Sequence, residues 1–147
     1  MLAKPTLRRK QQASTQQDKR GSMELLLEYC KDIHQWASSW EGEKADRKIG
    51  QAIVEQFKLF LLARIEKGRA KKTIKTYAGY LWALGGELIR QIHNDSKDRR
   101  LSARDLILKY IDNSGGPYWR HTHNEQDHDK YDSVCKQLFK FMTTDTD

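Results

Sequence analysis

Residues 68–77 read Gly-Arg-Ala-Lys-Lys-Thr-Ile-Lys-Thr-Tyr and join two long segments that have a helical pattern. Apolar residues recur three or four positions apart over residues 48–67 and again over residues 71–92, which is the spacing of one helix face. Glycine frequently ends a helix, so Gly68 marks the end of the first one. The sequence therefore predicts two long helices joined by a short basic turn.

Three further segments show the same period: residues 22–40, 102–111 and 126–142. No segment shows the sustained alternation of apolar and polar residues that is typical of a strand. Within the 71–92 helix, Gly85 and Gly86 predict either a close helix crossing or a kink. We therefore predict an all-α fold.

Composition sets limits on the class of protein. The chain has 147 residues, of which 37% are hydrophobic, and its formal net charge is +7. This length suits one domain with a tail rather than a multi-domain enzyme. No uninterrupted apolar run is long enough to span a membrane, and no apolar stretch follows the basic N-terminus as it would in a secretory signal. Cys30 and Cys135 fall within apolar helical patterns, which indicates buried thiols in a reducing cytoplasm.

The charge is distributed unevenly along the chain. Residues 1–20 carry six basic residues and one aspartate, a net charge of +5, among polar residues that bury little surface. We predict a disordered basic arm over residues 1–21. Residues 64–75 again carry a net charge of +5, whereas residues 121–147 carry −3. We therefore expect one basic band and one acidic end.

The basic turn suits a phosphate ligand. The N-terminus of a helix presents free N–H groups and a partial positive charge. The three lysines and two threonines of residues 71–76 add donors of the kind that bind DNA backbones. Lysines at this position oppose the helix dipole, and this small cost to folding favours a functional explanation. An ordinary solvated turn is the other interpretation of the same residues.

The spacing of five residues resembles the core-binding domain of tyrosine recombinases of the phage-integrase type: Gly68, Ala70, Thr73, Tyr77 and Leu81. Three other segments are similar to the first, third and fourth helices of that domain: residues 48–67, 101–111 and 138–142. The similarity extends over about residues 48–143.

The resemblance implies a four-helix core-binding bundle over residues 48–143, which grips one side of a DNA duplex. An additional N-terminal helix over residues 22–41 would precede it, and residues 144–147 would form a tail. In such domains the second and fourth helices approach the DNA, and the 71–92 helix is the second. Carried over by position, Lys72, Thr73, Lys75 and Thr76 become its DNA contacts. The charge of the basic turn adds Arg69 and Lys71 to the predicted contacts, and Arg120 is added because a guanidinium can stack on a base. Besides double-stranded DNA, the partner considered is a recombinase catalytic subunit or domain.

The chain departs from the pattern of that family in several places. Ala70 stands where the family commonly has a serine that caps the second helix. Residues 124–130, at the start of the fourth helix, are acidic, which argues against phosphate contact there. No histidine is followed three positions later by arginine, as the catalytic signature of the family requires, and the chain ends five residues beyond the last predicted helix. We therefore expect a non-catalytic DNA-binding module without a cofactor, which acts in DNA integration or recombination.

Two other hypotheses remain open. His121, His123 and His128, with nearby aspartates, have ligand types that bind zinc, although loops rich in these residues are common on surfaces. Trp36 and Trp40 either cap the bundle or form a surface that docks another protein, because aromatic anchors serve both uses. In the second case the chain would be a helical interaction protein, or an accessory protein of a mobile element that binds a recombinase.

Overall fold

The computed structural model describes residues 21–122 and 124–144, and over these residues the protein is helical with no strand. The all-α prediction is confirmed. The predictions for the basic arm, for His123 and for the end of the tail fall outside the described residues. No helix in the described part of the chain is both long and apolar enough to cross a membrane.

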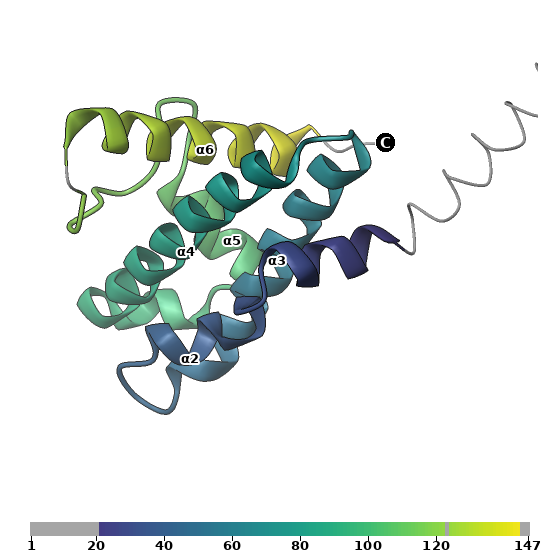
Figure 1. The fold of residues 1–147 in the computed structure, drawn as a ribbon. Helices are drawn as coiled ribbons and strands as arrows, with labels where there is room; N and C mark the ends of the chain where they lie inside the picture. Colours follow the sequence, from purple (N-terminus) through teal and green to yellow (C-terminus); the bar gives the residue numbers. More distant parts are fainter. Residues whose placement is uncertain (1–20, 123, 145–147) are drawn as a thin grey trace, which may run out of the picture.

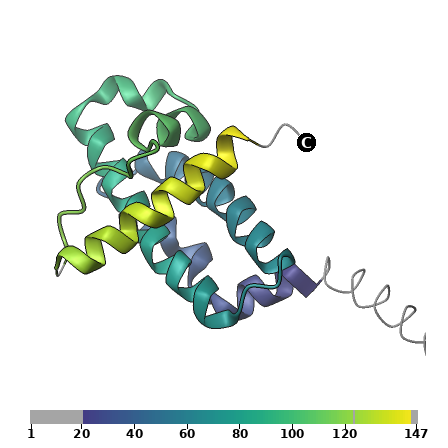
Figure 2. The ribbon, with the colours of Figure 1, turned by 90° about the horizontal axis from the view of Figure 1, so that it is seen from above.

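The order of the helices agrees with the periodic segments. After a first helix over residues 21–29, the elements are η1 (Ile33–Gln35), α2 (Trp36–Trp40), α3 (Asp46–Glu66), α4 (Lys71–Asn94), η2 (Ser96–Arg100), α5 (Ala103–Tyr110) and α6 (Glu125–Thr143). The two long helices α3 and α4 lie in the middle, with α2 on one side and α6 on the other (Figure 1). Seen from above, α6 crosses over α4 (Figure 2).

Large apolar side chains hold the long helices together. Phe60 of α3 is fully buried and contacts two rings edge to face, those of Tyr77 on α4 and Phe141 on α6, at centroid distances of 5.7 and 5.6 Å. The predicted core residues Ile74 and Leu81 are also fully buried, and Tyr77 is partly buried against the same core. The 74–77–81 face of α4 is therefore the inner face, as its periodicity predicts.

The N-terminal segment corrects one prediction. Residues 22–40 do not form one continuous helix: the first helix ends at residue 29, and η1 and α2 follow after a turn. The turn directs Trp36 and Trp40 into the core, where they are only 3% and 9% exposed. A Cβ atom on Gly85 would lie 2.1 Å from the Trp40 ring, so this glycine leaves room for the indole. Of the two outcomes predicted for the glycine pair, the structure has the close approach, and α4 continues through it without a break.

Residues 22–41 are therefore part of the same core as the helices that follow. Leu26, Ile33 and Trp36 belong to the cluster of buried side chains that also contains the inner faces of α3, α4, α5 and α6. The sequence set this segment apart because the resemblance did not extend to it. The structure packs it against α3 and α4 as an integral layer.

Two buried aspartates fix the loops at the α2 end of the bundle. The Asp46 carboxylate is fully buried and accepts hydrogen bonds from the backbone N–H groups of Gly42 and Glu43 and from the side chains of His93 and Arg99. Burial by itself would raise the pKa of Asp46, but the bonds from Glu43, Gly42, His93 and Arg99 outweigh it and lower the pKa below 3.8. The carboxylate therefore stays ionised and joins the α2–α3 loop to the end of α4 and to η2.

Asp98 has the same function between η2 and α5. It is 2% exposed and accepts hydrogen bonds from the Lys109 ammonium and the Tyr110 hydroxyl. Burial opposes ionisation, but the bonds from Lys109 and Tyr110 lower the pKa of Asp98 overall. Sequence analysis did not predict η2, because its residues are polar and its position depends on these distant partners.

Candidate nucleic-acid interface

The strongest basic surface lies at the turn between α3 and α4. We call it the basic edge and define it by Lys67, Arg69, Lys71, Lys72 and Lys75, all of which are exposed. The turn is possible because Gly68 adopts a φ of +85°, a conformation that favours glycine at the end of a helix. The Gly68 N–H donates to the Ile65 carbonyl at 2.9 Å, and the Arg69 N–H donates to the Arg64 carbonyl at 3.2 Å. The backbone thus holds the basic residues at the end of the two long helices.

The cations of the basic edge lack acidic partners. None of the ion pairs in the described ranges involves a residue of the basic edge, and the first turn of α4 contains no acid. Lys71 has an aromatic neighbour instead, with its ammonium 5.8 Å from the centre of the Tyr29 ring. The N-cap residue Ala70 has no side chain that could accept from the helix N–H groups. Within the described residues, these lysines and the helix terminus are therefore not paired with a carboxylate and are available to an external anion.

The two predicted threonines lie on the same helix but differ in exposure. Thr76 is exposed, and its hydroxyl donates to the Lys72 carbonyl at 3.0 Å. Thr73 is half-buried. Lys71, Lys72, Lys75 and Thr76 line one shallow hollow on the surface of α4. The structure therefore brings together most of the predicted contact residues.

Arg120 lies apart from this group. It is exposed, but its backbone N–H donates to Glu87 at 3.2 Å, so its loop is attached to α4 near that residue. Glu87 follows Lys71 by sixteen positions, which corresponds to about 24 Å along a helix. Arg120 therefore does not belong to the basic edge, and the sequence could not show this because loop 111–124 has no periodicity.

The start of α6 has the opposite electrostatic character. Glu125 and Asp127 occupy its first turn, and Asn124 caps it by accepting from the Asp127 N–H at 2.7 Å. Asp127 also accepts from the Tyr80 hydroxyl at 2.6 Å. Burial, together with this bond and the charge of Asp127, raises the pKa of Tyr80 to about 12. These acids favour the helix dipole but repel phosphate, as the sequence indicated.

The aromatic residue that sequence analysis missed is Trp82. It is 46% exposed on the outer face of α4 and lines a second hollow together with Lys75 and Gly79. The sequence indicates that this side chain is exposed, because position 82 falls outside the apolar stripe that contains Leu81 and Leu84.

The histidine loop does not form a metal site from the residues that the structure describes. His121 Nε2 lies 3.4 Å from the Arg90 guanidinium, and His128 Nδ1 lies 3.1 Å from the Asp132 carboxylate. Neither belongs to a group of three potential ligands in the described residues.

Another group in the described residues does bring three potential metal ligands within 4.8 Å of one another: Glu43, Asp46 and His93. Arg99 Nη2 already contacts the first two of them, at 2.8 and 3.1 Å. The guanidinium thus supplies the cation that balances these carboxylates, and the group serves the packing of the loops.

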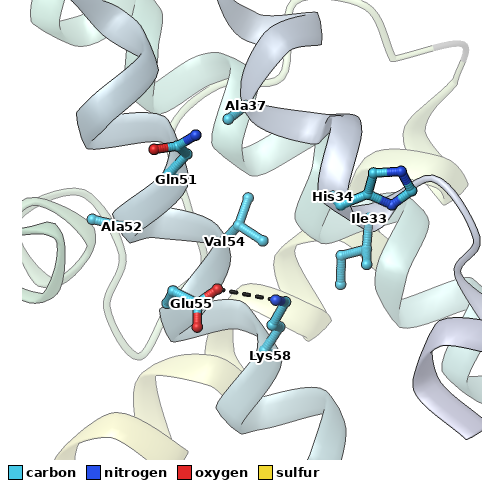
Figure 3. Close-up of a pocket in the computed structure, with 8 residues that line it drawn as sticks. All are labelled: Ile33, His34, Ala37, Gln51, Ala52, Val54, Glu55 and Lys58. Atoms are coloured by element: carbon cyan, nitrogen blue, oxygen red, sulfur yellow. Dashed lines mark hydrogen bonds and ion pairs between the residues drawn. The ribbon is translucent and has the colours of Figure 1, made fainter. Parts of the chain in front are cut away.

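A further hollow lies between the η1–α2 segment and α3 (Figure 3). Its lining combines apolar side chains such as Val54 with His34 and with an ion pair in which Lys58 Nζ and Glu55 Oε2 are 3.0 Å apart. These lining residues include one imidazole and no serine, threonine or cysteine nucleophile beside it. The hollow therefore contains no hydroxyl or thiol that the imidazole could activate as a nucleophile.

The burial of Trp36 and Trp40 also answers the question that the sequence left open about them. Their rings pack 6.2 Å apart inside the bundle, and the Trp40 Nε1–H donates to the Trp82 carbonyl at 2.9 Å. They close the core of the bundle, so the docking surface that the interaction-protein hypothesis assigned to them is not formed by these rings.

No protein-family model matches the chain, and no curated protein or solved structure matches it. The resemblance to a recombinase core-binding domain stays a prediction that depends on the motif of residues 68–81.

Proposed function

We propose that the protein is a non-catalytic DNA-binding module that holds one side of a duplex against the basic edge, in DNA integration or recombination. The observation that supports this is a group of five exposed cations that form no ion pair in the described part of the chain, held at one end of α4 by a positive-φ glycine. A recombinase catalytic domain or subunit is the protein partner that the motif implies.

The mechanism is the replacement of condensed counterions by lysine side chains. Duplex DNA attracts a dense layer of cations, and each phosphate that a lysine neutralises releases part of that layer. Lysine is a flexible point charge, so contacts of this type position the protein without reading the sequence. Binding of this kind is mostly independent of sequence and depends strongly on salt.

The experiment is fluorescence anisotropy of a labelled duplex titrated with the full chain at several salt concentrations. Affinity that falls steeply as salt rises supports the proposal. Absence of measurable duplex binding near physiological salt contradicts it and favours a helical interaction protein.

A further inference from the structure

A groove runs along α4 beside the N-terminal segment and begins at the basic edge. We call it the α4 groove and define it by residues from both sides: Tyr29, Asp32 and Trp36 from the N-terminal segment, and Lys75, Gly79 and Trp82 from α4. Lys75 also lines the hollow of the basic edge. The groove is therefore continuous with the lysines at one end. Figure 2 shows the first helix beside the start of α4.

Trp82 provides a flat apolar surface at the other end. The Trp82 Nε1–H donates to the Ser39 hydroxyl at 2.9 Å, while the Trp82 carbonyl accepts from Trp40. The bond to Ser39 holds the indole in place although it is 46% exposed, and the bond from Trp40 fixes the backbone beside it. A fixed, open aromatic ring loses little conformational entropy when a planar group stacks on it.

Gly79 leaves the floor of the groove open between Lys75 and Trp82. A Cβ atom built at this position would have no other atom within 4 Å, so the glycine is not required by packing. Glycine in the middle of a helix costs about 1 kcal/mol relative to alanine. The residue thus lowers helix stability and leaves the surface bare at the point where a ligand would pass from the lysines to the indole.

The two ends of the groove carry different charges. Lys71, Lys72 and Lys75 lie at one end, and Asp32 lies with Trp82 toward the other. A carboxylate repels phosphate but accepts hydrogen bonds from exocyclic amino groups of bases, as in cytosine. Trp82 follows Lys75 by seven positions, or about 10 Å along the helix. Phosphate thus fits at the lysine end and a base at the Trp82 end.

We propose that the α4 groove binds an unpaired DNA strand, with its phosphates on the lysines and a base stacked on Trp82. The inference rests on the proposed DNA-binding function and deepens it by naming the form of DNA. In the interior of a duplex the faces of the bases are stacked on one another and cannot reach an indole, whereas an unpaired strand presents them. Positively charged grooves with exposed aromatic rings are the usual means of holding single strands.

The test compares a blunt labelled duplex with the same duplex extended by a six-nucleotide single-stranded overhang, at one salt concentration. The wild-type chain should bind the extended duplex more tightly. Stacking of a base on an aromatic ring corresponds to a change of about 5- to 150-fold on removal of the ring. Trp82→Leu should therefore remove the advantage of the overhang and leave affinity for the blunt duplex unchanged. Tyr118→Leu is the matched control, because Tyr118 is an aromatic residue, 71% exposed, outside the groove.

Gly79→Gln is a second variant that does not depend on the folding of the tryptophan variant. Its side chain should fill the groove, while the open space around Gly79 and the better helix propensity of glutamine keep the fold intact. We expect a melting temperature equal to or above that of the wild type, together with loss of the overhang advantage.

The outcomes separate the two proposals. Equal affinity of the wild type for both probes overturns the proposal that the α4 groove binds an unpaired strand and leaves the proposed duplex binding intact. An overhang advantage that survives in both Trp82→Leu and Gly79→Gln also overturns it. Failure to bind either probe contradicts the proposed function itself.

Discussion

Replacing Lys71, Lys72 and Lys75 together by glutamine tests whether the basic edge binds phosphates. Each phosphate contact contributes a slope of about −0.9 to the logarithm of the binding constant against the logarithm of salt. All three lysines are exposed and belong to none of the ion pairs in the described residues, so each is free to contribute one contact. The slope should therefore become shallower by about 2.7.

This change of slope has a large effect over an ordinary range of salt. Between about 50 and 200 mM salt, a slope of −2.7 corresponds to about a 40-fold loss of affinity. The triple variant should lack this part of the salt dependence. The assay is anisotropy of a labelled duplex at four or more salt concentrations, repeated with duplexes of unrelated sequence. The loss should be the same for each sequence, because phosphate contacts carry no sequence information.

The fold should survive these substitutions. Removing cations from the first turns of α4 relieves an unfavourable interaction with the helix dipole, so the melting temperature should stay constant or rise slightly. Circular dichroism and thermal unfolding of the triple variant check this directly.

A second triple variant controls for net charge. Lys130, Lys136 and Lys140 are exposed on α6, and their replacement by glutamine removes the same three charges. We expect a smaller change of slope, because the acids of α6 offset these lysines. Equal changes of slope in the two triple variants would refute the reasoning and indicate diffuse attraction to a basic protein.

Three further predictions concern the fold that presents the basic edge. Gly85→Ala should lower the free energy of unfolding by about 1–3 kcal/mol, since its Cβ would overlap the Trp40 ring, whereas Gly79→Ala should raise it by about 1 kcal/mol. Urea denaturation measures both changes, and two changes in the same direction would contradict the packing described. Leu81→Ala should lower the free energy of unfolding by about 2–5 kcal/mol in the same assay, and a silent substitution would mean that α4 presents a different face to the core. The pKa of Asp46 is lowered in the folded state, so the stabilisation by its carboxylate is fully present above the unfolded pKa near 3.8 and is lost as the pH falls through the lower folded pKa. Asp46→Asn should flatten this part of the profile of unfolding free energy against pH, and an unchanged profile would refute the assigned role of Asp46.

The sequence by itself determined the class of fold, the order of the long helices and the inner face of α4. These features depend on the period of apolar residues along one segment, so no knowledge of its neighbours is needed. The turn at Gly68 and the lysines that follow it were predictable for the same reason, because both are local in the chain.

Only the tertiary structure decided which residues share a surface. The break after residue 29 lets the chain turn so that Trp40 finds space beside Gly85, 45 positions away, and this gain outweighs the local preference for a continuous helix. The α4 groove has walls from two segments about forty positions apart, so no single stretch of sequence contains it. Asp46 and Asp98 are ordinary surface residues by composition and become buried anchors only through partners from other elements. Periodicity shows which face of a helix is apolar, but contacts between distant segments depend on the packing of whole side chains in three dimensions.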